Sequence, residues 1–454
     1  MNLNQINSVY FIGIGGIGMS ALAKWFQQRN LPVAGYDKVQ TPLTLSLEQS
    51  GISIHYTDSV DQISDVFKDP LGTLLIYTPA IPKTHQELLY FQQGGFQIKK
   101  RSEVLGLITR DHFSIAVAGT HGKTTTSSMI AHILNQGPLG CSAFVGGIMT
   151  NYNSNLIIGG DQAPVVVEAD EFDRSFLRLS PDFSIVTSLD PDHLDIYGDP
   201  EEMRRSYLDF IQLTDKEGTI LLHEAVATQL RGVLDRKYKT YGLVDAQIMA
   251  KNIRVDGTKF IFDYVGDLEI KNIALALPGF HNVLNATAAI TAGLDQGLSP
   301  QLIQTAIESY SGVKRRFEYI VNSEDLVYID DYAHHPSEIE ALIRSVKKLY
   351  PEKKITAIFQ PHLFTRTRDF QKGFSESLSQ ADEVILLDIY PARELPIIGI
   401  TSEVILDDIS HESKCIAHLG DFPSFLNQYD LEVLLTIGAG DIDTLIPIIK
   451  SHYT

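Results

Sequence analysis

The segment from residue 114 to residue 126 limits the fold of this chain more than any other part of the sequence. It reads Ser114-Ile-Ala-Val-Ala-Gly-Thr-His-Gly-Lys-Thr-Thr-Thr126, an apolar run followed by a turn with two glycines and a helix start. Apolar residues then recur at three- and four-residue intervals, which indicates a helix with one apolar face: Met129, Ile130, Ile133 and Leu134. The segment therefore predicts a buried strand, a glycine turn and a helix that packs on a sheet.

Such a turn is typical of proteins that hold phosphates with the backbone N–H groups at a helix N-terminus. We expect Lys123 to reach the terminal phosphates of a nucleoside triphosphate and the Thr124 hydroxyl to face Mg²⁺. The usual pattern G-x-x-x-x-G-K-[ST] is not met, because Val117 stands where its first glycine belongs and Gly119 gives a shorter loop. An ordinary turn with a solvated lysine is the alternative. The residues predicted to bind the nucleotide here are Gly119, Thr120, His121, Gly122, Lys123, Thr124 and Thr125.

Composition narrows the class of protein further. The 37 Lys and Arg against 56 Asp and Glu give a net charge of −19, which disfavours nonspecific binding to nucleic acid or to an anionic membrane. No apolar run approaches the ~18 residues of a membrane span, and we expect a cytoplasmic protein. Cys141 and Cys415 lack metal-ligand spacing and are expected to be buried thiols. The sequence leaves the oligomeric state open.

Apolar, strand-like runs alternate with helical stretches nearly throughout the chain. This alternation predicts an α/β protein with mostly parallel sheets covered by helices on both faces. We expect three domains: a Rossmann-like domain at 1–110, a P-loop ATPase-like domain at 111–312 and a second Rossmann-like domain at 313–454. Residues 247–273 read as antiparallel β structure with a hairpin at Asp256-Gly257. The expected parallel strands are 9–14, 32–36, 74–78, 115–118, 165–168, 185–188, 355–359, 384–387 and 433–437.

A second glycine motif lies near the N-terminus. Its glycines fit G-x-G-x-x-G between a strand and a helix, and Asp37 completes the pattern of a dinucleotide site. Close backbone approach suits any diphosphate, so NAD and a UDP-sugar remain open, as does tight helix–strand packing without a ligand. The residues predicted to bind substrate here are Gly13, Gly15, Gly16, Gly18, Met19 and Asp37.

Polar residues follow two further strands of the predicted central sheet. Glu168 and Asp170 end one strand, and His193 follows another. Because parallel strands present ligands at their carboxyl ends, Glu168 is a candidate Mg²⁺ ligand and His193 a second metal or substrate ligand. Solvated loops or capping roles are the alternatives. Farther on, His281 and Asn285 share a face at a helix start and offer groups to a purine edge, unless they only cap the helix.

The last segment carries three polar loops, each after an apolar strand or at a domain start. They are rich in Arg and His, which suits binding of a carboxylate and of a transferring phosphoryl group. Surface charge alone would explain residues such as Lys314 and Arg368.

Taken in order, these motifs resemble the Mur ligases of peptidoglycan synthesis over nearly the whole chain. The similar stretches are those around Gly13, Gly119, Glu168, Asp192 and His281, together with Arg-Arg-Phe-Glu and Asp-Asp-Tyr-Ala-His-His-Pro in the last segment. These motifs are most similar to those of the branch of the family that adds L-alanine to UDP-N-acetylmuramate. The resemblance implies three domains that bind the UDP-sugar, ATP with Mg²⁺, and the amino acid.

The resemblance also implies residue roles. Lys123 contacts the γ-phosphate, and Thr124 with Glu168 holds one Mg²⁺ while His193 holds a second. His281 and Asn285 lie at the adenine, Arg316 with Asp331 near the nucleotide, and His334, His362 and Arg366 around the amino acid. The residues with implied catalytic roles are Lys123, His193, Arg316, Asp331, His334 and Arg366.

Two departures from the family pattern bear on the branch. Tyr207 stands where later members of the pathway carry a carbamylated lysine, which favours the alanine-adding branch. Leu363 stands where several alanine-adding enzymes have arginine, so the anchor of the amino-acid carboxylate is left unassigned. Three alternatives stay open: a ligase that recycles whole peptides onto UDP-N-acetylmuramate, a nicotinamide-dependent oxidoreductase, and a nucleotide-driven switch protein.

Overall fold

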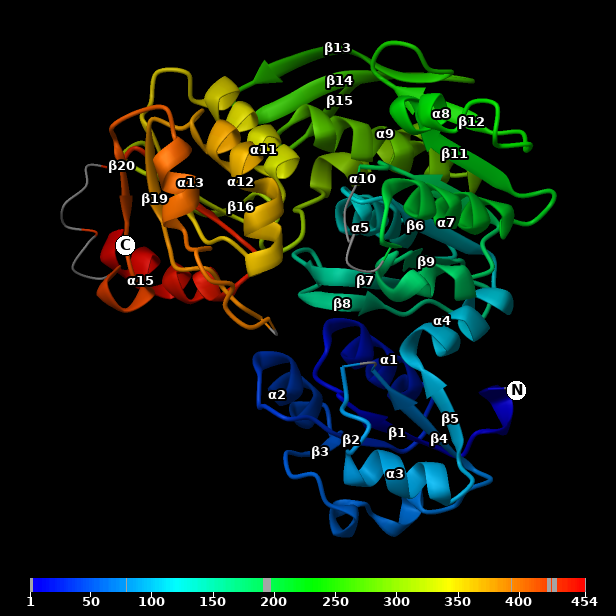
Figure 1. The fold of residues 1–454 in the computed structure, drawn as a ribbon. Helices are drawn as coiled ribbons and strands as arrows, with labels where there is room; N and C mark the ends of the chain where they lie inside the picture. The colour runs from blue at the N-terminus through cyan, green and yellow to red at the C-terminus, as the bar shows by residue number, and fades with distance from the viewer. Residues whose placement is uncertain are drawn as a thin grey trace. The chain divides into compact units, whose positions relative to one another are not determined.

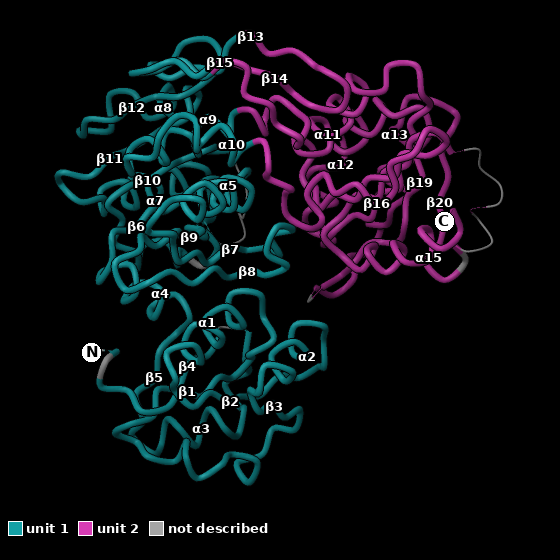
Figure 2. Tube along the Cα trace, turned by 180° about the vertical axis from the view of Figure 1, so that it is seen from behind, with its two compact units in different colours: residues 1–251, 264–270, 284–307 teal, residues 252–263, 271–283, 308–454 magenta. Residues whose placement is uncertain are grey.

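The computed structural model describes residues 3–78, 80–190, 197–392, 394–422, 426 and 431–453. Its strands form three sheets of five, ten and six strands, which follow one another along the chain (Figure 1). By contact the chain divides into two compact units, one of residues 1–251, 264–270 and 284–307, and one of residues 252–263, 271–283 and 308–454 (Figure 2). The α/β class with mostly parallel sheets is confirmed, while the domain limits at 110 and 312 stay predictions.

The first sheet is entirely parallel, in the order β3-β2-β1-β4-β5. The order reverses beside β1, so the glycine motif that follows β1 lies at the point where open parallel sheets bind ligands. Its strands are β1 Ser8–Ile12, β2 Val33–Tyr36, β3 Ser53–His55, β4 Thr73–Tyr77 and β5 Gln97–Lys100. Its helices are α1 Ile17–Gln28, α2 Pro42–Gln49, α3 Gln86–Gln93 and α4 Arg101–Arg110.

The second sheet has the order β15-β14-β13-β12-β11-β10-β6-β9-β7-β8. The strand before the phosphate loop, β6, pairs in parallel with β9 on one side and β10 on the other. The strands are β6 Ser114–Ala118, β7 Ser142–Met149, β8 Ser154–Ile157, β9 Val165–Glu168, β10 Phe183–Val186, β11 Thr219–His223, β12 Lys239–Gly242, β13 Ile248–Asp256, β14 Lys259–Val265 and β15 Glu269–Leu275. The helices are α5 Lys123–Asn135, α7 Pro200–Gln212, α8 Glu224–Gln229, α9 Phe280–Asp295 and α10 Pro300–Ser309.

Helix α5 differs from its prediction. Every residue from Thr124 to Leu134 is buried, and not only one apolar face. The reason is a second helix on its far side: a Cβ atom on Gly293 of α9 would lie 2.8 Å from Ile133 Cγ2, so the two backbones approach closely. The hydroxyl groups of the first turns are satisfied within the chain, for example Ser127 Oγ, which donates to Lys123 O at 2.8 Å.

The third sheet has the order β16-β17-β21-β18-β19-β20, with β16 antiparallel and the others parallel. Its strands are β16 Glu318–Asn322, β17 Val327–Asp331, β18 Ile355–Phe359, β19 Glu383–Leu386, β20 Lys414–Ile416 and β21 Val433–Ile437. Its helices are α11 Pro336–Leu349, α12 Phe364–Leu378, α13 Glu403–Asp408 and α15 Leu445–Tyr453.

Most predicted strands are found within two residues of their predicted starts. The expected antiparallel stretch forms β13, β14 and β15, which are neighbours in the sheet and are joined by short turns, with Gly257 at φ +59°. Cys141 is buried as predicted, but Cys415 is only partly buried because β20 is the edge strand of its sheet. Within the described residues, no helix is long and apolar enough to cross a membrane.

A buried polar cluster joins the strands and one helix of the first sheet. Tyr10 donates its hydroxyl to Glu87 Oε2 at 2.9 Å and lies 2.7 Å from His55 Nε2. The Glu87 carboxylate is fully buried, and burial raises its pKa to about 7. Burial also lowers the pKa of His55 and of His85, which pairs with Asp58.

The stability of this part of the chain should depend on pH through Glu87. An acid whose pKa is higher in the folded state favours folding at low pH, and that contribution is lost as the pH rises through about 7. Replacing Glu87 by Gln should remove this contribution to the pH dependence. Between about pH 5 and pH 8 the free energy of unfolding of the variant should therefore rise, relative to that of the wild type, by up to about 3 kcal/mol.

Urea unfolding followed by fluorescence measures this locally, because Trp25 of α1 is the only tryptophan of the chain and is buried. Parallel pH curves for Glu87→Gln and wild type would contradict the role given to Glu87.

Candidate active site

The phosphate loop needs glycine at two positions for steric reasons. Gly119 has φ +138° and Gly122 φ +80°, both in the region that favours glycine. A Cβ atom on Gly119 would lie 2.0 Å from Thr187 Oγ1, and one on Gly122 would lie 2.8 Å from Asn285 Oδ1. The backbone of the loop therefore lies directly against the end of β10 and against α9.

Hydroxyl groups after β10 hold the loop in place. His121 N donates to Ser188 Oγ at 2.7 Å, and Thr187 Oγ1 donates to His121 O at 2.5 Å. Thr120 Oγ1 lies 2.9 Å from Ser188 Oγ, and His121 Nε2 lies 3.4 Å from Asp190 Oδ2. These bonds fix the loop before any ligand binds, so the amides at the start of α5 are preorganised for an anion.

Lys123 opens α5 and is largely buried. Its ammonium donates to Gly119 O at 2.6 Å and to Glu171 Oε1 at 2.7 Å. Burial acts to lower the pKa of Lys123, but Glu171 and Glu168 outweigh it, so the pKa lies above its ordinary value and the side chain is charged. The sequence did not assign Glu171 a role, although it stands in the polar stretch that follows β9.

The two predicted Mg²⁺ ligands that the structure describes lie together. Thr124 Oγ1 donates to Glu168 Oε1 at 2.9 Å, and Gly146 N donates to Glu168 Oε2 at 2.7 Å. A hydroxyl next to a carboxylate is a suitable oxygen pair for Mg²⁺ beside phosphates. The third predicted ligand, His193, lies outside the described residues, and among those described no group of three His, Cys, Asp or Glu could hold a metal ion.

Of the polar residues on α9, Asn285 lies closest to the loop. It is buried, and its Oδ1 accepts a hydrogen bond from Thr126 Oγ1 at 3.1 Å. Asn282 donates to Pro278 O at 2.7 Å and so serves the backbone at the helix start. His281 is exposed one turn before Asn285, a placement compatible with an adenine contact.

The N-terminal glycine motif forms a turn whose acid is used by the backbone. Gly15 N donates to Asp37 Oδ2 at 2.7 Å, and Lys38 N donates to Asp37 Oδ1 at 2.7 Å. Both oxygens of the Asp37 carboxylate therefore accept hydrogen bonds from backbone amides, and these bonds stabilise the turn. Gly16 is the N-cap of α1, and the amides at a helix N-terminus are suited to binding an anion, so the diphosphate contact stays a prediction.

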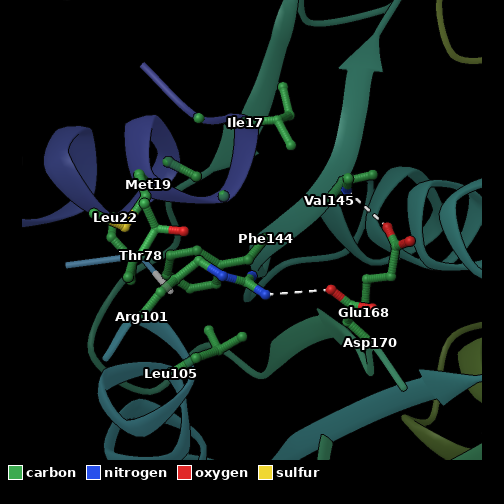
Figure 3. A pocket seen from close by; sticks show the side chains of 14 residues that line it. Ile17, Met19, Leu22, Thr78, Arg101, Leu105, Phe144, Val145, Glu168 and Asp170 are labelled. Carbon is green, nitrogen blue, oxygen red and sulfur yellow. Dashed lines mark hydrogen bonds and ion pairs between the residues drawn. The ribbon is translucent and has the colours of Figure 1, made fainter. Parts of the chain in front are cut away.

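A pocket of about 250 Å³ extends from this glycine turn to Glu168 and Asp170 (Figure 3). Arg101 lies in it and its Nη2 is 3.4 Å from Asp170 Oδ2. Nothing local in the sequence marks the Arg101 side chain as facing a site, so its place in the pocket was not predicted. The residues that line the pocket are Gly16, Ile17, Gly18, Met19, Ala21, Leu22, Thr78, Arg101, Leu105, Phe144, Val145, Gly146, Glu168 and Asp170.

Two consecutive arginines at the third sheet have different surroundings. Arg315 is bound to the fold: its guanidinium donates to Asp330 at 3.3 Å and to Gly438 O at 2.8 Å. Arg316 lies over the Tyr332 ring at 5.1 Å and forms no ion pair with another residue that the structure describes. The predicted Arg316 is therefore the one available to an anionic ligand.

Asp331 ends β17 and is held by two backbone amides. Phe317 N donates to Asp331 Oδ2 at 2.7 Å and Ala333 N donates to Oδ1 at 2.8 Å. Burial raises the pKa of Asp331 to about 6, with Arg316 opposing the rise. The carboxylate fixes the two loops that carry Arg316 and His334.

The residues predicted to bind the amino acid lie at the carboxyl ends of the strands of the third sheet. The rings of His334 and His362 are 6.3 Å apart, and Arg366 lies in the first turn of α12. Burial lowers the pKa of His334 to about 4, with Glu338 opposing and Arg366 adding to the shift, so the ring is neutral at pH 7. Leu363 caps α12 with φ +70°, and its amide donates to Tyr390 O at 3.0 Å.

Replacing Gly122 by Ala should weaken nucleotide binding by at least about tenfold, a loss of about 1.4 kcal/mol. The new Cβ atom would meet Asn285 Oδ1 at 2.8 Å in a backbone conformation that alanine resists. Gly257→Ala is the matched control, because Gly257 also has a positive φ but has no atom within 4 Å of the added Cβ. Titration calorimetry with ATP and Mg²⁺ measures both, and equal affinities for the two variants would contradict the assignment.

Comparison with known proteins supports one family along the whole chain. The Mur ligase family catalytic domain matches residues 8–113, the Mur ligase middle domain matches residues 117–293, and the Mur ligase glutamate ligase domain matches residues 315–440. A relative named UDP-N-acetylmuramate--L-alanine ligase from Cytophaga hutchinsonii is 47% identical over 454 residues, covering 99% of this chain and 97% of the relative.

Solved structures agree. The UDP-N-acetylmuramate-alanine ligase MurC of Thermotoga maritima is similar with a TM-score of 0.82 and 29% identity, covering 98% of this chain and 99% of its own. A murein peptide ligase from Psychrobacter arcticus shares the fold, with a TM-score of 0.69 and 22% identity over 96% of this chain and 97% of its own. The alternative of a nicotinamide-dependent oxidoreductase finds no support in these matches. With three domain models matched in order and a relative of this identity over its full length, the chain belongs to the Mur ligase family.

Proposed function

We propose that this chain is an ATP-dependent amide ligase that joins L-alanine to the carboxylate of UDP-N-acetylmuramate and releases ADP and phosphate. The observation that supports the proposal is the pocket lined by the glycine turn and by Glu168, because Glu168 also accepts a hydrogen bond from Thr124 at the start of the helix that follows the phosphate loop. A sugar nucleotide at the glycine turn and a triphosphate at the loop would then approach each other at Glu168. The name of the full-length relative at 47% identity supports the choice of substrates.

The chemistry follows from the poor reactivity of a carboxylate, whose oxygen is a poor leaving group. A carboxylate oxygen of the sugar nucleotide attacks the γ-phosphorus of ATP, the bond from that phosphorus to the β-phosphate oxygen breaks, and ADP leaves. The product is an acyl phosphate. The amino group of L-alanine then adds to its carbonyl carbon and loses a proton, and the tetrahedral intermediate collapses to the amide and inorganic phosphate.

The residues of the central sheet serve the first step. Amides from Gly119 to Lys123 hold the phosphates, and the Lys123 ammonium neutralises charge on the transferring group. Asn285 and His281 border the adenine end. One Mg²⁺ held by Thr124 and Glu168, and a second held by His193, would neutralise phosphate charge. Arg101 is placed to bind the sugar-nucleotide carboxylate, since its guanidinium faces the same pocket.

The residues of the third sheet assist with the nucleotide and bind the amino acid for the second step. Arg316, oriented by Asp331, binds phosphate oxygens of the nucleotide, and Arg366 with His362 binds the amino acid. His334 is neutral at pH 7, and its Nδ1 lies 3.0 Å from Tyr332 O, which leaves Nε2 to accept a proton or a hydrogen bond.

Phosphate release tests the proposal directly. Protein with ATP, Mg²⁺ and UDP-N-acetylmuramate should release phosphate when L-alanine is added and form a product one alanyl residue heavier. Stimulation by the alanyl-γ-glutamyl-diaminopimelate tripeptide alone would favour a peptide-recycling ligase. Release that needs no acceptor would favour a switch protein, and no release would contradict the ligase reading.

Lys123→Ala should lower kcat by about 10³-fold or more with the fold intact, because the ammonium acts mainly on charge that develops in the transition state. Lys216→Ala, which removes an exposed lysine from a surface turn, is the matched control and should keep wild-type turnover. Turnover of the Lys123 variant within a few fold of the control would rule out this role.

His334→Ala should raise the KM for L-alanine by about tenfold or more and leave the KM for ATP within about twofold, because the ring lies beside His362, which is proposed to bind the amino acid. His452→Ala, at an exposed position of α15, controls for loss of a histidine. Steady-state kinetics with each substrate varied in turn would show the difference, and a rise in the KM for ATP alone would move His334 to the nucleotide.

A further inference from the structure

Glu171 places a buried negative charge next to an anion-binding loop. Its side chain is only 2% exposed and its Oε1 lies 2.7 Å from Lys123 Nζ. A buried carboxylate without a partner is energetically costly, so Glu171 needs Lys123 as its partner in the folded protein. The mechanism described above makes no use of it.

The backbone fixes Glu171 where it is. Its carbonyl oxygen accepts from Tyr197 Oη at 2.6 Å and from Arg174 N at 2.9 Å. The short 3₁₀ helix Phe172–Arg178 begins directly after it. The carboxylate therefore cannot withdraw from the loop by a small shift of the main chain.

The ion pair uses the ammonium of Lys123. An ammonium has three N–H groups, and Lys123 directs them to Glu171 Oε1, to Gly119 O and, at 3.4 Å, to Thr120 O. A phosphate oxygen that approaches Lys123 must compete with these acceptors. Of them only Glu171 is charged, and it is the strongest competitor.

The charges around the loop do not favour a polyanion. Three carboxylates, Glu168, Asp170 and Glu171, end or follow β9, and the cations that pair with them among the described residues are Lys123 and Arg101. Asp170 pairs with Arg101, and Glu171 pairs with Lys123. Glu168 is bound only by a hydroxyl and an amide among the described residues, so its charge is left for a cation.

We propose that Glu171 is a positioning residue that competes with the triphosphate for Lys123 and thereby makes nucleotide binding depend on a divalent cation. This inference rests on the proposed function. With a cation at Glu168, the local charge favours the triphosphate and Lys123 is shared with it. Without a cation, Glu171 retains the lysine and the nucleotide is repelled.

Glu171→Gln tests this, because it keeps the shape of the side chain and removes its charge. Titration calorimetry with ATP is carried out with excess Mg²⁺ and again with EDTA, and the ratio of the two Kd values is the readout. The variant should bind metal-free ATP about tenfold tighter than wild type, while its Kd with Mg²⁺ changes less, so the ratio falls. A role in folding alone would not change this ratio.

Two further variants serve as controls. Glu171→Asp keeps the charge and should keep a ratio close to wild type. Glu103 of α4 is another lysine-paired glutamate, with its Oε1 3.3 Å from Lys99 Nζ. Glu103→Gln removes this charge and should leave both Kd values unchanged. If Glu171→Gln does not fold, the two Kd values of the wild type still test the inference. Wild type that binds metal-free ATP as tightly as Mg²⁺-ATP would overturn it.

The outcomes separate this inference from the proposed function. Wild type that binds Mg²⁺-ATP, with Glu171→Gln unchanged or weaker in EDTA, would overturn the role of Glu171 alone. Wild type that binds no ATP under either condition would overturn the proposed function and this inference with it.

Discussion

The position of the phosphate loop between two parallel strand ends determines the rest of the site. Because β6 pairs with β9 on one side and β10 on the other, the loop that follows it receives acids from β9 and hydroxyl groups from the end of β10. The hydroxyl groups of Thr187 and Ser188 hold the loop backbone, and Glu168 and Glu171 face the first two residues of α5. The order of these three strands therefore explains why the loop backbone is held by hydrogen bonds, why Glu168 lies beside Thr124, and why Glu171 lies beside Lys123.

The sequence predicted what is local or periodic. The phosphate loop, the parallel strands and the start of α9 follow from apolar runs and from glycines at fixed spacing, and the structure has them within a few residues. Family membership likewise followed from the order of short motifs. What the sequence did not reveal depends on residues far apart in the chain. The burial of α5 on all sides comes from α9, and the pairing of Lys123 with Glu171 joins residues 48 positions apart.

Neighbouring residues of one type were also separated only by the structure. Arg315 and Arg316 are equivalent in a sequence motif, but a positive φ at Arg315 turns its guanidinium to the interior, where Asp330 and two carbonyl groups bind it. The glycine motif near the N-terminus was ambiguous for another reason: several ligands contain a diphosphate that the backbone of such a motif can approach. In the structure Asp37 accepts hydrogen bonds from the Gly15 and Lys38 amides, so it supports the turn, and its contact with a substrate stays a prediction.

The central claim is that the substrate carboxylate is activated by direct transfer of the γ-phosphoryl group. The most direct measurement starts from UDP-N-acetylmuramate labelled with ¹⁸O in its carboxylate and determines the mass of the phosphate released with ATP, Mg²⁺ and L-alanine. The account predicts that each released phosphate carries one oxygen from the carboxylate, because that oxygen stays bonded to phosphorus when the amide forms. Unlabelled phosphate accompanied by amide formation would contradict the account.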